Sequence, residues 1–137
     1  MEPDDARVKA LRRAAAAASE RAYCPYSEFP VGAAVLAEDG SIYSGCNVEN
    51  ASYGLTVCAE RNAVFQAVAA GHQRILAVAV YTPTASPTPP CGACRQVINE
   101  FGPDAEVFSF ARSSAILHFR LAELLPGAFG PDDLKAE

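Results

Sequence analysis

Three of the five cysteines restrict the fold of this chain more than any other feature of the sequence. Cys91 and Cys94 form a C-x-x-C pattern at the start of a predicted helix, and Cys58 lies at the start of another predicted helix. Residues at i and i+3 share a helix face, so both sulfurs of the pair can reach one ion. If Cys58 binds the same ion, two helix N-termini meet there, and their partial positive charge favours thiolates.

Two other interpretations of these cysteines have to be weighed. Buried cysteines of a reduced protein often act as small hydrophobic residues, and a lone C-x-x-C also serves as a redox pair. A third cysteine at a helix start favours Zn²⁺ over both. An odd number of cysteines and an acidic start, Met1 to Asp5, without the features of a signal peptide argue against a disulfide framework. We therefore expect a cytoplasmic protein.

Length and charge narrow the class of partner. The chain has 137 residues and a mass of 14.4 kDa, which predicts a single domain over residues 1–137. Its formal net charge of −5 disfavours nucleic acid, which is bound mainly through Lys and Arg. The alanine run at residues 14–18 is too short to span a membrane. A small or uncharged substrate is the expected partner.

The hydrophobic pattern predicts one α/β unit. Helices are expected at residues 5–22, 57–70 and 92–101, with a last helical turn at 121–125. Strands are expected at residues 30–36, 41–48, 75–81, 106–111 and 115–120, and a tail that frays toward its end at 126–137. This order predicts a mixed sheet with helices packed on it.

A catalytic zinc site keeps one position for water, whereas a structural site needs a fourth protein ligand. His72 follows the far end of the helix that starts near Cys58, roughly 20 Å away by the helical rise. His118 lies in a strand pattern, which favours an ordinary strand histidine. Cys24 and Cys46 have no partner at ligand spacing and are expected to be buried free thiols. These residues therefore leave the fourth position open.

Charged residues follow two of the expected ligands. Glu60 comes two residues after Cys58, where an acidic residue in the first helical turn is favoured in any case. Arg61 is one turn from Cys58, and Arg95 directly follows Cys94. Both arginines are candidates to offset the negative charge that three thiolates bring to Zn²⁺.

In combination these motifs resemble a known family. Cys58-Ala59-Glu60, followed by Pro90-Cys91-Gly92-Ala93-Cys94, resembles the zinc-deaminase signature, in which zinc activates a water and a non-ligand glutamate is general acid and base. Cysteine in place of the usual histidine narrows the resemblance to the small three-cysteine cytidine deaminases. The further matching segments are residues 26–34, 47–51, 58–61, 91–96, 124–126 and 129–131. Pro89 departs from the pattern, because a hydroxyl residue is common there.

The resemblance implies a three-layer α/β/α fold with a mixed five-stranded sheet. It also implies hydrolytic deamination of cytidine and deoxycytidine, with Zn²⁺ held by Cys58, Cys91 and Cys94 and Glu60 as the proton shuttle. Arg61 is then a residue that supports the metal ligands. Such enzymes are homotetramers with shared active sites, and their reaction belongs to pyrimidine salvage.

Substrate contacts are expected from several further residues. Asn47 and Glu49 lie two apart at a strand end, so their side chains leave the same face, although a polar strand end is the commoner meaning of this pattern. The resemblance implies that they bind the ribose, chiefly its 3′-hydroxyl. Phe29, which would be a core residue by default, is implied to lie against the pyrimidine. The other residues implied to contact substrate are Ala59 and, shared between subunits, Ala51, Tyr53 and Phe129.

Two other functions remain possible on sequence grounds. A related deaminase could act on another aminopyrimidine nucleoside, such as a blasticidin-type antibiotic, but the Asn47 and Glu49 pair argues against it. A non-enzymatic zinc module for protein interaction has no use for Glu60 and would need a fourth protein ligand. The preference between ribonucleoside and deoxyribonucleoside is left open.

Overall fold

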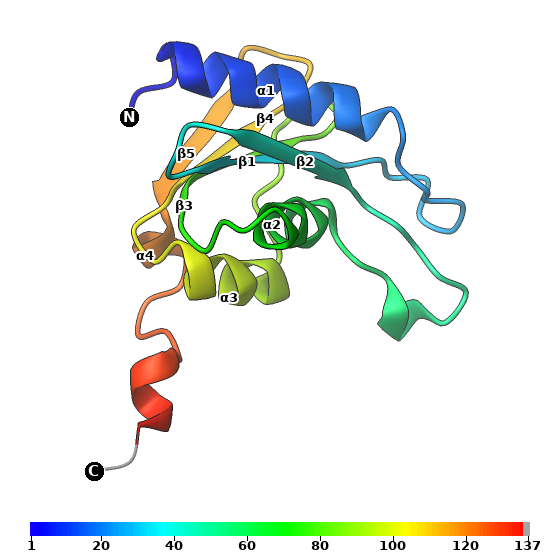
Figure 1. Ribbon diagram of the computed structural model, residues 1–137. Helices are drawn as coiled ribbons and strands as arrows, with labels where there is room; N and C mark the ends of the chain where they lie inside the picture. The colour runs from blue at the N-terminus through cyan, green and yellow to red at the C-terminus, as the bar shows by residue number, and fades with distance from the viewer. Residues whose placement is uncertain (136–137) are drawn as a thin grey trace.

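Five strands form one continuous sheet in the computed structural model, which describes residues 1–135 (Figure 1). The strands are β1 (Gly32–Ala37), β2 (Ile42–Cys46), β3 (Ile75–Tyr81), β4 (Glu106–Phe110) and β5 (Ile116–Arg120). Their order across the sheet is β2-β1-β3-β4-β5. The β3–β4 pair is parallel and the other pairs are antiparallel, which confirms the mixed five-stranded sheet.

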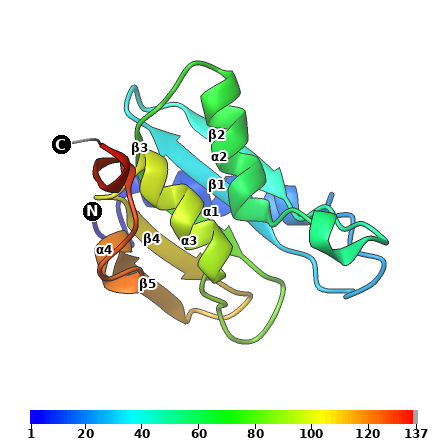
Figure 2. The ribbon, with the colours of Figure 1, turned by 90° about the horizontal axis from the view of Figure 1, so that it is seen from below.

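Helices cover both faces of the sheet. Helix α1 (Ala6–Ser19) lies on one face, and α2 (Ala59–Ala69) and α3 (Gly92–Phe101) lie on the other. Figure 2 shows α2 and α3 side by side across the strands, while the short α4 (Leu121–Leu124) follows β5. The expected three-layer α/β/α arrangement is confirmed.

The core is divided by the sheet into two clusters, because successive residues of a strand point to opposite faces. In β1, Val35 packs in the cluster with α2 and α3, and Leu36 packs in the cluster with α1. Helix α1 approaches β1 so closely that a Cβ at Gly32 would meet the carbonyl oxygen of Ala15. The glycine at this position is therefore what lets the helix lie on the strand.

Several element boundaries differ from the sequence prediction. Helix α1 begins after Asp5, whose side chain accepts a hydrogen bond from the Arg7 amide at 2.9 Å, and it ends at Ser19. Helix α2 begins at Ala59 because Val57 still pairs with Val48 in an isolated β-bridge. Strand β2 is shorter than residues 41–48 for a related reason, since Val48 lies outside the sheet in that bridge.

Two short 3₁₀-helices were not predicted. They are η1 (Tyr53–Leu55), between β2 and α2, and η2 (Pro131–Leu134), in the C-terminal tail. Both lie on segments that project away from the sheet and its helices (Figure 1). The tail expected to fray toward its end therefore contains a short helix, and residues 136–137 of that prediction lie outside the described residues. Within residues 1–135 no helix is both long enough and apolar enough to cross a membrane.

The topology brings the cysteine-bearing helix starts to one end of the sheet. Strand β3 leads through residues 82–90 into α3, which returns the chain to the parallel strand β4. Ligands of open α/β sheets bind outside the carboxyl ends of parallel strands. Val80, at the carboxyl end of β3, lines a cavity together with Cys58 and Cys91.

Candidate active site

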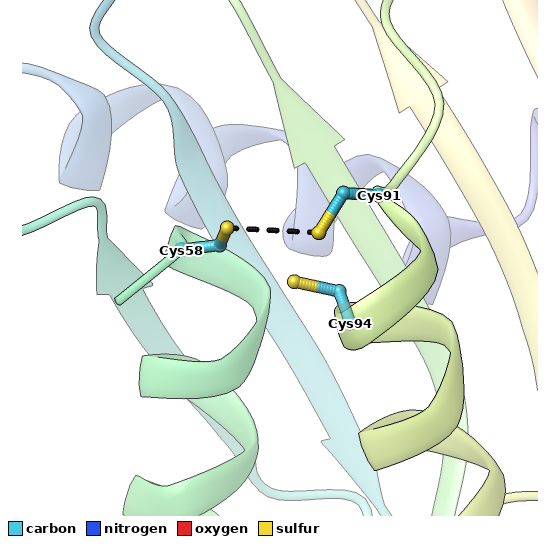
Figure 3. A group of neighbouring side chains, drawn as sticks. All are labelled: Cys58, Cys91 and Cys94. Carbon is cyan, nitrogen blue, oxygen red and sulfur yellow. Dashed lines mark hydrogen bonds between the residues drawn. The ribbon is translucent and has the colours of Figure 1, made fainter. Parts of the chain in front are cut away.

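Cys58, Cys91 and Cys94 converge on one point (Figure 3). Their sulfur atoms all lie within 4.8 Å of one another, and the sulfurs of Cys58 and Cys91 are 3.7 Å apart. Among the described residues, this is the one group of three or more His, Cys, Asp or Glu side chains with ligand atoms this close together. The predicted meeting of two helix starts is therefore found, without a fourth protein ligand among residues 1–135.

The local backbone explains why these sulfurs are available. Cys58 is the N-cap of α2 and Cys91 is the N-cap of α3, and both have extended backbone angles. Neither side chain makes the hydrogen bond that usually caps a helix. Cys94 lies in the first turn of α3 and is completely buried. Both helix N-termini bring partial positive charge to the cluster, which favours anionic sulfur.

The pKa values of the Cys58 and Cys94 thiols are shifted in opposite directions. Hydrogen bonding to Cys94 lowers the pKa of Cys58 to about 5, and Arg61 and Cys91 add to this effect. The same hydrogen bonding raises the pKa of Cys94. Cys58 is thus deprotonated more readily than Cys94. A divalent cation fits this donor set. It would displace the protons of the thiols, and the three sulfurs would then share its positive charge.

Arg61 is the cation that contacts the cluster. Its Nη2 donates to the sulfur of Cys58 at 3.4 Å, and its Nε is buried without a hydrogen-bond partner among the described residues. Arg95, the other arginine considered, has a different role from the one expected. It donates to the carbonyl oxygens of Pro90 at 2.8 Å and Leu124 at 3.0 Å, and so fixes the loop before α3.

Glu60 is a buried carboxyl group beside the cysteines. Only 4% of its surface is exposed, and burial raises its pKa to about 7 from an ordinary value of 4.5. A carboxyl group that titrates near neutral pH can both accept and donate a proton under working conditions. Perturbed carboxyl groups in a cleft are typical of functional sites.

A cavity of about 420 Å³ joins Glu60 to most of the predicted substrate residues. The predicted residues that line it are Phe29, Asn47, Glu49, Cys58, Ala59, Glu60 and Cys91. Sequence reasoning missed six others, which are Ser27, Val31, Thr56, Val80, Thr88 and Pro89. Val80 could have been found from its place at the end of a buried strand, and Ser27 and Val31 from the matching segment 26–34. A larger groove of about 580 Å³, between α1, β2 and α2, contains none of the predicted site residues.

Asn47 and Glu49 both reach the cavity, as the two-residue spacing predicts, but they also bind the backbone of its wall. The amide of Asn47 accepts from the Val31 N–H and donates to the Phe29 carbonyl, each at 2.9 Å. One carboxylate oxygen of Glu49 accepts from two backbone N–H groups in the same loop. Both side chains therefore hold the backbone of the cavity wall.

Three predicted substrate residues do not line this cavity. Ala51 and Tyr53 lie on the projecting segment around η1, and Phe129 lies in the tail before η2 (Figure 1). Tyr53 is 75% exposed and Phe129 is 57% exposed. A single chain therefore leaves these side chains available to another molecule.

The remaining cysteines and histidines lie apart from the cluster. Cys24 and Cys46 are free thiols, but they are partly exposed, so the expectation that they are buried was wrong. Cys24 lies between α1 and β1, and Cys46 is the last residue of β2. His72 is 3.6 Å from the carboxylate of Asp39, and His118 is 2.9 Å from that of Glu106. These contacts account for both histidines without a metal.

Comparison with known proteins decides the family. Residues 6–110 match the family described as "Cytidine and deoxycytidylate deaminase zinc-binding region". The chain belongs to this family. The cysteine cluster fits the three-cysteine zinc site of such proteins, and the chain is accordingly a zinc-dependent deaminase with Zn²⁺ as its cofactor.

Individual relatives extend the match to most of the chain. The cytidine deaminase of Sporosarcina psychrophila is 53% identical over 118 residues, which cover 85% of this chain and 87% of the relative. That of Mycobacterium tuberculosis is 46% identical, with 93% and 92% covered. The crystal structure of cytidine deaminase from Burkholderia pseudomallei superposes with a TM-score of 0.84 at 51% identity, and 88% of this chain and 98% of that chain are covered.

Proposed function

We propose that the protein hydrolyses the 4-amino group of cytidine and deoxycytidine, giving uridine or deoxyuridine and ammonia. The observation that carries this proposal is the carboxyl group of Glu60, buried beside the three-cysteine cluster in a cavity with Phe29 and Glu49. The relatives named as cytidine deaminases support the same reaction. It would serve pyrimidine salvage.

In this proposal Cys58, Cys91 and Cys94 hold the Zn²⁺ ion. When bound, zinc supplies a Lewis acid that makes a water molecule a stronger nucleophile. Glu60 accepts a proton from the attacking water and donates it to N3 of the pyrimidine, which makes C4 more electrophilic. Glu60 then carries the second proton to the departing amine, as the C4–N bond breaks and the new C4–O bond remains. Its pKa of about 7 suits both transfers.

Substrate positioning falls to the side chains opposite the cluster. Phe29 presents an aromatic face to the cavity, on which a pyrimidine can stack. The carboxylate of Glu49 also lines the cavity and can accept a hydrogen bond from a sugar hydroxyl. Ala59 adds a small apolar contact at the start of α2.

The charge of the cavity favours a nucleoside over a nucleotide. Within residues 1–135 its lining contains the carboxyl groups of Glu49 and Glu60 and neither lysine nor arginine. A 5′-phosphate would therefore meet negative charge without a cation to bind it. This supports free nucleosides as substrates and argues against nucleic acid.

We also propose a homotetramer in which Ala51, Tyr53 and Phe129 complete a neighbouring active site. The support is their exposure on two segments that project from the sheet and helices. The single sheet that joins the described strands supports one domain over residues 1–137. Five free cysteines support a reducing, cytoplasmic environment.

An absorbance assay with purified protein tests the reaction. Cytidine, deoxycytidine, CMP, cytosine and adenosine are compared at equal concentration. We expect turnover of cytidine and deoxycytidine, and at least ~10²-fold less turnover of the other three compounds. CMP carries a phosphate that the cavity does not bind, cytosine lacks the sugar, and adenosine has a purine in place of the pyrimidine. Turnover of CMP at the rate of cytidine would contradict the nucleoside proposal. Native mass spectrometry of the same sample tests the tetramer.

A further inference from the structure

The wall of the active-site cavity contains a loop that is held in two halves. Before Glu28, the backbone N–H groups of Tyr26 and Ser27 donate to Oε1 of Glu49 at 3.0 and 3.1 Å. These two bonds fix the first half of the loop to the segment that follows β2. Ser27 in this half lines the cavity that contains Glu60.

The second half is held by a different side chain from the same segment. Asn47 donates from Nδ2 to the Phe29 carbonyl and accepts at Oδ1 from the Val31 N–H, each at 2.9 Å. Asn47 is only 8% exposed, so these bonds are protected from water. Phe29 and Val31 both line the cavity. The positions of these two side chains therefore depend on how the second half follows the first.

Glu28 joins the two halves in an unusual backbone conformation. Its φ is +54°, and among the described residues it is the only non-glycine residue with positive φ. This left-handed conformation is uncommon for residues other than glycine, asparagine and aspartate, because the Cβ approaches the backbone. The Glu28 N–H donates to the Cys24 carbonyl at 2.9 Å, which closes the turn. Its side chain is exposed, so neither burial nor a core contact explains the conformation.

We propose that Glu28 is a positioning residue for substrate binding, because its left-handed backbone joins the two halves and places Phe29 and Val31 on the cavity wall. Strained backbone conformations persist where the surrounding contacts over-determine them, and they cluster at functional sites. Here the bonds from Asn47 and Glu49 supply those contacts. The inference rests on the proposed function for what occupies the cavity, but the loop geometry itself does not.

Substitutions that differ in backbone preference test this role. Glu28→Val and Glu28→Thr introduce β-branched residues, which disfavour positive φ strongly. We expect each to raise KM for cytidine by about 10-fold with kcat within about 2-fold, because only a fraction of molecules then has the competent loop. Glu28→Gly and Glu28→Asn tolerate positive φ, and both should keep KM within about 2-fold of the original.

Control variants separate the backbone from the side chain. Glu28→Gln removes the charge and should leave KM unchanged. Glu38→Val makes the same substitution at an exposed turn residue without positive φ, and should also leave KM unchanged. An unchanged KM in Glu28→Val and Glu28→Thr would overturn the proposal. The proposal would also be overturned if KM rose as much in Glu28→Gly and Glu28→Gln as in Glu28→Val, because the effect would then come from loss of the carboxylate.

Amide hydrogen exchange provides a measurement that needs no activity. The N–H groups of Ser27 and Val31 are protected by Glu49 and Asn47. We expect faster exchange at both in Glu28→Val and no change in Glu28→Gln or Glu38→Val. If no nucleoside is deaminated, the proposed function fails. The exchange rates still show in that case whether Glu28 holds the conformation of the loop. Unchanged exchange together with normal zinc content would overturn the positioning role.

Discussion

The guanidinium of Arg61 donates a hydrogen bond to the sulfur of Cys58 over 3.4 Å, from the next turn of the same helix. The same nitrogen, Nη2 of Arg61, also donates to the Thr56 carbonyl at 3.5 Å. The hydrogen bond to Cys58 raises the pKa of Arg61, so the pair remains charged. A cation in this position can draw electron density from a ligand sulfur and so tune the metal.

Replacing Arg61 with glutamine should therefore weaken the metal centre. We expect Arg61→Gln to lower turnover of cytidine by roughly 10- to 100-fold, the usual effect of losing a hydrogen bond to a ligand. Adding Cys58→His should recover part of the rate, because it removes one negative charge. The measurement is kcat with zinc content determined on the same samples. Arg74→Gln, at an exposed arginine, is the control and should keep the normal rate. A normal rate in Arg61→Gln would show that Arg61 does not offset the negative charge of the thiolates.

Zinc content should depend on three cysteines and be independent of the other two. We expect about one zinc per chain in the purified protein, and loss of zinc in Cys58→Ser, Cys91→Ser and Cys94→Ser. Cys24→Ser and Cys46→Ser should retain the metal, since their sulfurs lie outside the cluster. Elemental analysis provides the count. A cobalt-substituted protein whose spectrum requires four thiolates would contradict the three-cysteine site.

Glu60 should be needed for turnover and not for the metal. Glu60→Gln keeps the shape of the side chain but cannot carry a proton, so we expect kcat to fall by at least ~10²-fold. Zinc content and thermal stability should be preserved. Glu100→Gln, at an exposed helical position, should keep full activity. Near-normal kcat in zinc-loaded Glu60→Gln would exclude the carboxyl group as the proton shuttle.

The close approach of α1 to β1 predicts an intolerant glycine. A Cβ at Gly32 would collide with the Ala15 carbonyl and lie 2.6 Å from the Ser19 backbone nitrogen, so the helix would have to move. We expect Gly32→Ala to lower the free energy of unfolding by about 1–3 kcal/mol or more, as overpacking does. Gly54→Ala, with no atom within 4 Å of the added Cβ, should change it by less than about 0.5 kcal/mol. Urea unfolding of both variants checks this, and equal stabilities would show that α1 adjusts freely.

The N-cap of α1 should stabilise the protein in a pH-dependent way. Hydrogen bonds from Arg7 lower the pKa of Asp5 to about 2, below its ordinary value of 3.8. The unfolded chain therefore binds the proton more readily, and the stabilisation is present above pH 3.8 and lost as pH falls through about 2. We expect Asp5→Ala to lower the melting temperature at pH 6, with a smaller difference near pH 2. Asp4→Ala is the control. If the melting temperatures of Asp5→Ala and the original protein differ by the same amount from pH 6 to pH 2, the N-cap does not stabilise the protein in a pH-dependent way.

Much of the architecture could be predicted from local sequence. The period of the apolar residues and the flanking glycines and prolines placed every strand and every α-helix, with two of them, Ile75–Tyr81 and Gly92–Phe101, at their observed bounds. Errors at the other ends arose where contacts between distant segments compete with local preference. Val48, for example, pairs with Val57 and Tyr23, so it leaves the strand that its own hydrophobicity favours.

The sequence alone also determined which residue types form the cysteine cluster, because three cysteines at two helix starts have few other uses in a reduced protein. Only the tertiary structure decided how the neighbouring side chains divide their roles. Arg61 contacts a sulfur while Arg95 holds the Pro90 loop, and Asn47 binds the backbone of the cavity wall. Spacing along a helix or strand predicts the face from which a side chain projects. The residue that this side chain contacts depends on how distant segments pack together, and that packing is cooperative. For the same reason the left-handed backbone of Glu28 has no local signal, since the contacts that hold it come from Asn47 and Glu49 on the segment that follows β2.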